Sequence, residues 1–424
     1  MAYKAIRGTK DILPAECSEW QEIENACREV FRTFGYGEIR TPIMEETGLF
    51  IKTVGEDTDI VKKEMFSFTD RGERDISLRP EGTAPVIRAY LEHNLDKTEP
   101  FQKICYIGPM FRAERPQAGR LRQFHQVGVE AIGSSNAALD AEVIDILTRL
   151  LRACKIEKYQ LHLNNLGCRE DKKKLSALLV ELFSKKISAA VLCEDCRRRL
   201  KTNPIRVLDC KNDGCRTIIR KSFGEIEFLC RDCKAHFDRT LKFLDLLNIK
   251  YTVDPYIVRG IDYYTRTVFE VTHEGLGSQN AIGAGGRYDN LIKDMGGPSL
   301  SACGFALGLD RVLMARSKEP ATAGRTAGID IFVATLGEAA YEKGFLILNE
   351  LRHGGISSDI DYENSSLKSQ MRRADKLGAS LVLIVGDEEI ARNEAVLRDM
   401  RTKKQVSAKF DSVISEAKTM LGAR

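Results

Sequence analysis

The sequence predicts an α+β protein of more than one domain, and three observations support that prediction. The chain has 424 residues, whereas a typical domain has roughly 100 to 200. Strand-like and helical segments are mixed through the first 316 residues, where a basic, cysteine-rich block interrupts them. From residue 329 onward, short apolar strands alternate with helices, which is typical of a small α/β sheet with parallel strands.

The composition is that of a globular protein. Hydrophobic residues make up 43% and charged residues 30% of the chain, while 11 prolines and 33 glycines are too few for a collagenous or low-complexity protein. No apolar run approaches the roughly 18 residues that span a bilayer, and residues 1–11 lack the apolar stretch of a signal peptide. We therefore expect a cytoplasmic protein with no membrane partner.

The net charge of +4 is unevenly distributed. Residues 171–240 hold 17 Lys and Arg against 10 Asp and Glu, a balance of +7, so the rest of the chain sums to −3. Six of the twelve cysteines lie in this block, which we call the insertion. Without a secretory signal they do not indicate a disulfide framework, because the cytosol keeps thiols reduced.

The first element is predicted to be an amphipathic helix over residues 18–34, with Ser18 and Gln21 in capping-box spacing at its start. Residues 35–37 end it, and residues 38–43 follow as a strand whose Pro42 suits a sheet edge or an interface. The apolar face of this helix is formed by Trp20, Ile23, Cys27, Val30, Phe31 and Phe34.

The following elements come in order along the chain. Residues 65–77 have strand-and-turn character, and 81–93 form a helix after Pro80. Two strands, 103–114 and 123–131, are joined by a basic loop; a helix at 138–151 and a strand at 159–165 come next. The predicted domains are 1–170, the insertion at 171–240, a Gly-rich β continuation within 241–316, a linker at 317–328 and an α/β domain at 329–424. In this last domain we expect strands at 329–334, 357–361 and 381–385 and helices at 339–351 and 367–377.

The segment 110–130 is the most informative about chemistry. Its two strands could bring several side chains onto one sheet face, where an arginine can bridge a phosphate and a carboxylate and a phenylalanine can stack on a flat base. Taken alone, the segment also suits a solvated charged hairpin. The residues concerned are Arg112, Glu114, Phe124, Gln126 and Glu130.

Two later segments are candidates on weaker grounds. Arg259 stands near Tyr263 and Tyr264 beside a strand, a pattern that is more often surface packing. The glycines of residues 283–289 would let a backbone approach a ligand closely, although they equally suit a tight turn. Residues 304–312 taken alone are an ordinary strand-to-helix transition with an exposed arginine, Arg311.

Together and in this order, the segments resemble the class II aminoacyl-tRNA synthetases, and among them the histidyl-tRNA synthetases. Residues 7–11 (RGTKD) resemble the N-terminal block of that family, and the helix and strand through Pro42 resemble its first class motif. FRAER through Glu130 resembles the second motif, and GFALGLDR the third. Two blocks, RPEGT at 79–83 and RGIDYY at 259–264, are specific to the histidine enzymes.

The resemblance implies an antiparallel catalytic sheet that binds ATP with Mg²⁺ and L-histidine and acts on histidine tRNA. It implies that Arg112 and Arg259 are catalytic. The sequence departs from the usual pattern in having Asp310 before the motif arginine and, to a larger extent, in the insertion, whose cysteines many relatives lack. The implied ATP-binding residues are Arg112, Glu114, Phe124 and Arg311, and the implied histidine-binding residues are Glu81, Thr83, Arg112, Gln126, Glu130, Arg259, Tyr263, Tyr264 and Tyr288. Glu130 and Tyr264 would read the two imidazole nitrogens.

The resemblance is compatible with two functions. The first is ATP-dependent activation of histidine to histidyl-adenylate, followed by transfer to the 3′ end of histidine tRNA. The second is the function of the regulatory subunit of ATP phosphoribosyltransferase, a catalytically silent paralogue that has the same core and senses histidine. That paralogue usually lacks the 259–264 block, the insertion and the C-terminal α/β domain, and this chain has all three.

The insertion and the first helix suggest further partners. Two CxxC pairs, Cys193 with Cys196 and Cys230 with Cys233, are a plausible tetrathiolate zinc knuckle, with Cys210 and Cys215 as alternative ligands and reduced thiols as the other reading. The basic runs 172–174 and 197–199 could contact tRNA phosphates, although such runs are often solvated surface. The family's first motif pairs subunits, so we expect a homodimer. The resemblance also implies that residues 329–424 bind the anticodon arm.

Overall fold

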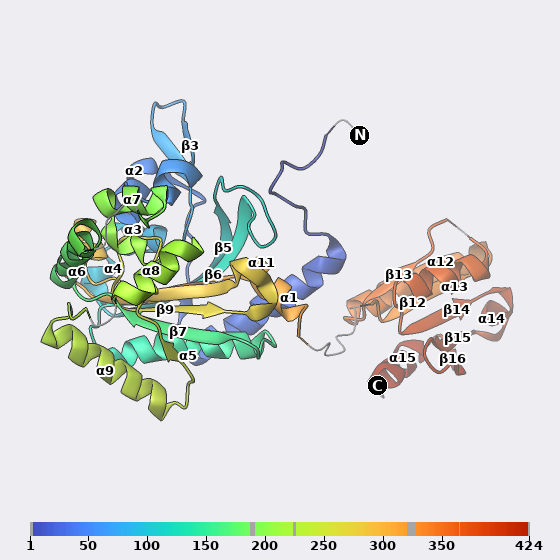
Figure 1. Ribbon diagram of the computed structural model, residues 1–424. Coiled ribbons are helices and arrows are strands. Elements are labelled where there is room, and N and C mark those ends of the chain that lie inside the picture. Colours follow the sequence, from blue (N-terminus) through green and yellow to red (C-terminus); the bar gives the residue numbers. More distant parts are fainter. Residues whose placement is uncertain (1–2, 187–190, 224–225, 320–327, 364, 423–424) are drawn as a thin grey trace. The chain divides into compact units, whose positions relative to one another are not determined.

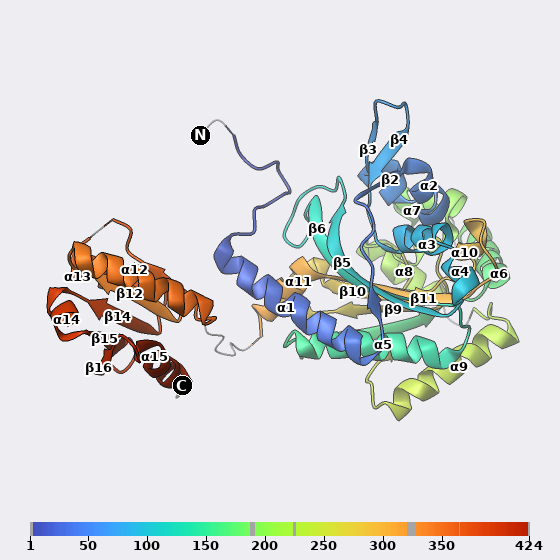
Figure 2. The ribbon, with the colours of Figure 1, turned by 180° about the vertical axis from the view of Figure 1, so that it is seen from behind.

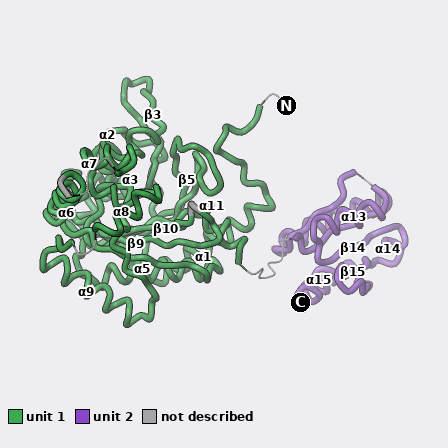
Figure 3. The backbone as a smooth tube through the Cα atoms, in the orientation of Figure 1, with its two compact units in different colours: residues 1–320 green, residues 321–424 purple. Residues whose placement is uncertain are grey.

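A computed structural model describes residues 3–186, 191–223, 226–319, 328–363 and 365–422. It divides into two compact units, residues 1–320 and 321–424 (Figure 3). Most of the predicted linker, residues 320–327, lies outside the described residues. Within the described chain, no helix combines the length and the apolar character needed to cross a membrane.

The first unit is built on one eight-stranded sheet (Figure 1). Its central pairs are antiparallel, and only the two outermost pairs, β1 with β5 and β7 with β8, are parallel. The predicted α+β class and antiparallel core are therefore confirmed. In sheet order the strands are β1 Gly37–Glu38, β5 Gln102–Phe111, β6 Gln123–Ile132, β11 Ala302–Gly308, β10 Ala281–Arg287, β9 Thr265–Thr272, β7 Gln160–Asn165 and β8 Thr252–Val253.

One face of this sheet is covered by three helices, α1 Pro14–Thr33, α5 Ala137–Ala153 and α9 Arg231–Leu246 (Figure 2). The apolar stripe of α1 is buried as its 3.6-residue period predicts. The predicted capping box is wrong, because the helix begins earlier, at Pro14, whose fixed φ suits the first helical turn. Ser18 therefore lies inside the helix, where its hydroxyl donates to the carbonyl of Ala15.

The opposite face of the sheet carries α3 Thr83–Glu92 and the helices of the insertion other than α9, which packs on α5. The insertion consists of α6 Arg169–Glu181, α7 Glu194–Thr202, the 3-10 turn Pro204–Val207, α8 Asp213–Phe223 and most of α9. Its apolar side chains share one core with α3 and with Tyr106 and Tyr264 of the sheet region. The insertion therefore packs against the same side of the sheet that bears the candidate site.

A small three-stranded sheet lies beside α3, with β4 between β2 and β3. The strand-and-turn character predicted for residues 65–77 is confirmed, since residues 70–74 join β3 to β4. The predicted strand 38–43 is shorter than expected: only Gly37–Glu38 pairs, at the edge of the main sheet as Pro42 suggested, and pairing resumes at Met44. The remaining elements are β2 Met44–Glu46, α2 Thr47–Val54, β3 Phe66–Thr69, β4 Asp75–Leu78, α4 Leu95–Thr98, α10 Leu291–Asp294 and α11 Leu309–Arg316.

The second unit is a five-stranded sheet in the order β13-β12-β14-β15-β16. The three predicted strands are present and parallel. The last two strands pair antiparallel and were not foreseen, because their polar, alternating sequences lack the continuous apolar run of a buried strand. The elements are β12 Ile331–Thr335, α12 Glu338–His353, β13 Ser358–Ile360, α13 Leu367–Lys376, β14 Leu381–Val385, α14 Asp387–Arg392, β15 Glu394–Asp399, β16 Gln405–Lys409 and α15 Val413–Gly422.

Candidate active site

A cavity of about 190 Å³ opens on the antiparallel strands of the main sheet. Arg112 and Phe124 belong to the β5–β6 hairpin, Arg311 to α11 after β11, and Glu81 to the loop before α3. The sheet thus gathers side chains that are up to 230 residues apart in sequence. Ten predicted site residues line the cavity: Glu81, Thr83, Arg112, Glu114, Phe124, Gln126, Arg259, Tyr263, Tyr264 and Arg311.

The remaining two predicted residues, Glu130 and Tyr288, are fully buried next to Thr83. The Thr83 hydroxyl donates to one Glu130 oxygen at 2.7 Å, and the Tyr288 hydroxyl donates to the other. Gly304 provides space for this carboxyl group, since a Cβ there would lie 2.0 Å from Glu130 Oε2. Burial, reinforced by the charge of Glu81, raises the pKa of Glu130 to about 8 despite both hydrogen bonds.

Replacing Glu130 by Gln should change how stability depends on pH. The ordinary pKa of this group is 4.5 and the folded value is about 8, so the folded protein binds more protons between these pH values. Its contribution is full below pH 4.5 and declines as pH rises to 8, by up to about 1.4 kcal/mol per pH unit. Glu130→Gln has no carboxyl group at this position and so does not lose stability in this way. The difference in thermal midpoint, variant minus wild type, should therefore increase between pH 5.5 and pH 8. A constant difference in midpoint would contradict the burial argument.

Glu81 lies at the same end of the cavity. Its two carboxylate oxygens accept the backbone N–H groups of Thr83 and Ala84, each at 2.8 Å, at the start of α3. The Tyr263 hydroxyl is 3.4 Å away. Burial raises the pKa of Glu81, while the two backbone hydrogen bonds act in the opposite direction. A buried carboxylate that faces a cavity is a site for a cationic group of a ligand.

Arg112 connects the two ends of the cavity. Its Nε donates to the carbonyl of Pro80 at 2.9 Å, which holds the guanidinium beside the Glu81 loop. The same guanidinium lies 5.3 Å from the centre of the Phe124 ring. Arg112 lines the cavity, with Nη1 3.9 Å from Glu114 Oε1, and an arginine fork can bind oxygens of a carboxylate or phosphate there.

The second arginine, Arg259, forms an ion pair with Glu270 of β9 at 2.6 Å. Its guanidinium lies 6.0 Å from the Tyr264 ring centre. Among the described residues, Arg259 Nε is buried without a hydrogen-bond partner, and so is Gln126 Oε1. Buried polar atoms without partners are rare, so their presence in a cavity indicates that a ligand satisfies them.

The opposite end of the cavity is basic. Arg311 is fixed by donating to the carbonyls of Gly119 at 2.8 Å and Ala281 at 2.5 Å. Glu114 is paired with Arg120 at 3.0 Å. The guanidinium groups of Arg112, Arg120 and Arg311 therefore line the cavity, together with the carboxylates of Glu114, Asp310 and Glu270, the last of which is paired with Arg259. Such an arrangement suits a polyphosphate.

Sequence reasoning missed several residues that shape the site. Glu270 is the only acidic residue of β9. The sequence could have indicated it as a site residue, because a carboxylate in a largely buried strand needs a partner. Arg120 was hidden among the many charges of its loop. Asp310 was noted only as a departure from the family pattern; its Oδ2 accepts the backbone N–H of His125 at 2.8 Å and so ties α11 to β6.

The glycines of residues 283–289 have a mixed role. Gly283 lines the cavity, as the ligand-approach reading expects. Gly285 instead permits close strand packing, since a Cβ there would lie 2.2 Å from the Gly304 carbonyl. Arg287 is fully buried and binds Asp140, with Nε at 2.9 Å. Gly285 and Arg287 therefore stabilise the sheet that carries the site and do not line the cavity.

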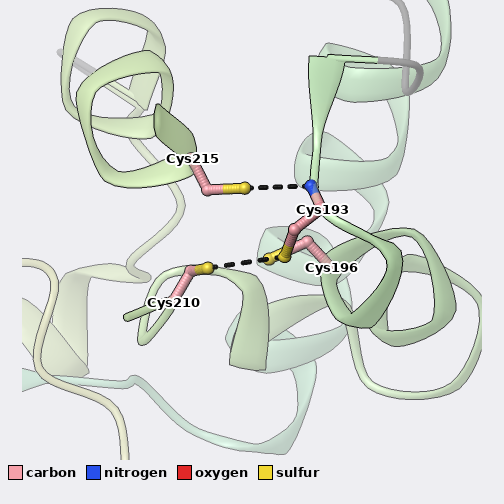
Figure 4. Close-up of side chains that lie close together, drawn as sticks. All are labelled: Cys193, Cys196, Cys210 and Cys215. Atoms are coloured by element: carbon pink, nitrogen blue, oxygen red, sulfur yellow. Dashed lines mark hydrogen bonds between the residues drawn. The ribbon is translucent and has the colours of Figure 1, made fainter. Parts of the chain in front are cut away.

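The predicted grouping of the zinc ligands is wrong. Cys193 and Cys196 do not lie with Cys230 and Cys233. The first pair gathers with the alternative ligands, in a cluster of Cys193, Cys196, Cys210 and Cys215 (Figure 4). The second pair gathers with two residues that the sequence reasoning did not consider, Cys168 and Asp171. The two CxxC pairs have the same internal spacing, so the sequence does not reveal which helix N-termini lie close together.

An antiparallel sheet whose β5–β6 hairpin and α11 present arginines to one cavity, with the Glu81 carboxylate also in its lining, is the arrangement of the catalytic domain of a class II aminoacyl-tRNA synthetase. The family model "Histidyl-tRNA synthetase" matches residues 8–312, and "Anticodon binding domain" matches residues 330–420. The chain belongs to the histidyl-tRNA synthetase family.

Individual relatives agree with this assignment. A histidine–tRNA ligase of Halothermothrix orenii is 45% identical over 421 residues, covering 99% of this chain and 100% of the relative. The crystal structure of apo S. aureus histidyl-tRNA synthetase is similar with a TM-score of 0.82 and 36% identity, covering 98% and 100% of the two chains. A Bacillus halodurans structure described as an ATP phosphoribosyltransferase regulatory subunit/histidyl-tRNA synthetase has a TM-score of 0.67 at 20% identity, covers 91% and 99%, and shows the fold alone.

Proposed function

We propose that this chain activates L-histidine with ATP to histidyl-adenylate and transfers the histidyl group to the 3′ end of histidine tRNA. The single observation that carries the proposal is the polarity of the cavity. One end, which we call the inner end, is lined by the buried carboxyl group of Glu81, with Glu130 buried behind Thr83, and the other, the outer end, is lined by three arginines. An amino acid and a nucleoside triphosphate present the complementary charges in that order.

The inner end fits histidine. Glu81 and Thr83, with Gln126 opposite, would bind the α-ammonium group. Glu130 and Tyr264 would each hydrogen-bond one imidazole nitrogen, and Tyr263 and Tyr288 would hold these groups in place. The imidazole ring has two nitrogens that form hydrogen bonds. A side chain without such atoms would leave Glu130 and Tyr264 unpaired, so it would bind weakly.

The outer end fits ATP. Phe124 would stack on adenine, Glu114 would accept from its amino group, Arg112 would hold the α-phosphate and Arg311 the γ-phosphate. Mg²⁺ accompanies ATP as part of the substrate.

In the activation step, a carboxylate oxygen of histidine forms a bond to the α-phosphorus as the bond to the pyrophosphate oxygen breaks. The α-phosphoryl oxygens gain charge when both oxygens are close to phosphorus. Arg112 and Arg259 supply fixed positive charge there, in a cavity where water does not screen it. The protein contributes position and electrostatics and forms no covalent bond itself.

The sensor alternative is not favoured. A histidine sensor needs the inner end of the cavity alone, whereas here Arg259, Arg311 and Phe124 line the outer end as well. Relatives that cover the whole chain are named as ligases. Since charging serves translation, we place the enzyme in the cytoplasm.

The C-terminal unit matches an anticodon-binding domain, which supports tRNA binding. We propose that residues 329–424 bind the anticodon arm. They hold 14 Lys and Arg against 15 Asp and Glu, so local patches and base stacking must replace bulk attraction.

A chain truncated after residue 319 should still form histidyl-adenylate, because no residue of the cavity lies beyond Arg311. Its KM for histidine tRNA should rise by about 10-fold or more, which corresponds to about 1.4 kcal/mol of lost binding. Pyrophosphate exchange and tRNA charging, measured side by side, check this. Charging with an unchanged KM for tRNA would contradict the anticodon proposal.

The basic runs of the insertion divide into two kinds. Lys172 donates to the backbone carbonyls of Asp262 and Tyr264, at 2.8 and 2.9 Å, and Arg199 donates to the carbonyl of Arg206. Lys172 and Arg199 therefore serve the structure. Arg197 and Arg198 on α7 are exposed, and we propose that they contact phosphates of the tRNA acceptor stem.

Replacing Arg197 and Arg198 by Ala should weaken tRNA binding and reduce the slope of log affinity against log salt by up to about 2. Histidine activation should not change. Arg149→Ala is the matched control, since this exposed arginine is on α5, which covers the other face of the sheet. A salt slope equal to that of wild type would make Arg197 and Arg198 ordinary solvated residues.

Two further parts of the assignment concern assembly and metal. We propose a homodimer that pairs through α1 and the edge strand β1, where Ile43 and Met44 expose apolar side chains nearby. We also propose that the cysteines of the insertion hold structural zinc, with ligand sets that differ from the expected one.

A further inference from the structure

We propose that two zinc ions hold the insertion to the catalytic unit. One ion binds the four sulfurs of Cys193, Cys196, Cys210 and Cys215, which we call the inner site. The other binds Cys168, Asp171, Cys230 and Cys233, which we call the hinge site. Both rest on the positions of the ligand atoms alone, so their failure would leave the assigned activity intact.

The inner site has the dimensions of a tetrathiolate. Its four sulfurs all lie within 4.8 Å of one another, and Cys193 Sγ and Cys210 Sγ are 3.8 Å apart. With Zn–S bonds of about 2.3 Å, a tetrahedron has edges of about 3.8 Å. A disulfide would require about 2.05 Å. Figure 4 shows the four side chains converging from three separate elements on one point.

Backbone donors support sulfur in the charged form at the inner site. The N–H of Cys193 donates to Cys215 Sγ at 3.0 Å, and the N–H of Asn212 donates to Cys210 Sγ at 3.4 Å. Outer hydrogen bonds of this kind orient and stabilise metal-bound thiolates. Thiols that only fill a core gain nothing from meeting at one centre, because apolar packing has no preferred direction.

The hinge site is formed by two helix starts. Cys168 and Asp171 occupy the N-cap and third position of α6, and Cys230 and Cys233 occupy the same two positions of α9. One Asp171 oxygen accepts the N–H of Cys230 at 3.0 Å, which links the two helices directly. The positive N-terminal ends of both helices offset the excess negative charge of three thiolates and a carboxylate around a divalent ion.

The two sites have different structural roles. Cys168 follows β7, where the chain leaves the sheet. Cys230 precedes α9, which packs against α5 as the chain returns to the sheet. The hinge site would therefore join the beginning of the insertion to its end. The inner site spans the segment that faces the catalytic loop 259–264. In that segment Arg206 donates to the carbonyl of Arg259 at 3.0 Å, and Asn203 donates to Asp262 at 2.8 Å.

Cavity geometry places the inner site close to the reaction. Cys193 and Cys210 line a second cavity of about 420 Å³ together with Arg112, Glu114 and Arg120 of the candidate active site. A metal ion there would stiffen the wall behind the catalytic arginines without touching substrate. Its role would be structural, and its loss would be felt through the position of the loop 259–264.

The test is metal content of the full chain, purified without chelator and with reduced thiols. We expect two zinc ions per chain by mass spectrometry of the elements. Cys210→Ser with Cys215→Ser should remove one ion, Cys230→Ser with Cys233→Ser should remove the other, and all four changes should remove both. Cys17→Ser, outside both clusters, is the control and should keep two ions.

Because a cysteine variant can fail to fold, a second measurement uses the wild-type chain. Zinc is removed and cobalt(II) is titrated in while the intense visible bands of tetrahedral cobalt thiolate are followed; the bands should grow until two equivalents are bound. A folded, active chain with no zinc and no cobalt bands would overturn the proposal and return the cysteines to reduced core thiols. A single ion lost only with Cys210 and Cys215 would overturn the hinge site.

Discussion

Arg259→Ala should lose at least ~100-fold in the rate of histidine-dependent pyrophosphate exchange, as expected for removal of one preorganised transition-state donor. The physical reason is the position of the half-buried guanidinium, which lines the cavity, is paired to Glu270 at 2.6 Å, and has a buried, unpartnered Nε. The loss should appear mainly in kcat, because this charge is needed most when the phosphoryl oxygens gain charge.

Removing Arg259 also leaves Glu270 unpaired, which by itself would repel ATP. The double variant Arg259→Ala with Glu270→Gln separates the two effects. If charge stabilisation is the role of Arg259, the double variant recovers KM for ATP but not kcat. Recovery of kcat to within a few-fold of wild type would contradict the catalytic role. Circular dichroism and thermal unfolding show whether each variant is folded.

Glu81→Gln should raise the KM for histidine by about 100-fold, since truncating one side of a buried charged pair costs about 2–5 kcal/mol. The substitution keeps the shape of the side chain but removes the charge that faces the α-ammonium group. KM for ATP should change little, because Glu81 lies at the inner end of the cavity.

Glu92→Gln is the matched control for Glu81→Gln. Glu92 ends the same helix, α3, and pairs with Arg88 at the surface. Its KM for histidine should equal that of wild type. A Glu81 variant that loses affinity for ATP and not for histidine would reverse the assigned polarity of the cavity.

Much of the fold could be predicted because periodicity follows burial. The strands 103–114 and 123–131 were placed within a few residues of β5 and β6, and the helix at 138–151 within two residues of α5. The strands β15 and β16 escaped prediction because an antiparallel strand with one face in solvent, like β15, or at the sheet edge, like β16, needs only alternating polarity, which a loop can also show. The helix start at Pro14 was missed because a capping-box match outweighed a proline signal.

The site was predicted mainly through resemblance, and its gaps have a common cause. Glu270 and Arg120 act as partners of the named arginines, and partnership between distant strands is not written in local sequence. The cysteines show the same limit. Spacing identified two pairs of candidate ligands, but only the meeting of the N-terminal ends of α6 and α9 decides that Cys230 lies beside Asp171 and not beside Cys193.

The central claim is that the cavity performs histidine activation, and the most direct measurement is exchange of labelled pyrophosphate into ATP by the intact chain. Exchange should require L-histidine and Mg²⁺, should be absent with phenylalanine or glutamine in its place, and should fall at least ~100-fold in Arg259→Ala. A chain that binds histidine but exchanges no pyrophosphate in its presence would contradict the account and identify a sensor.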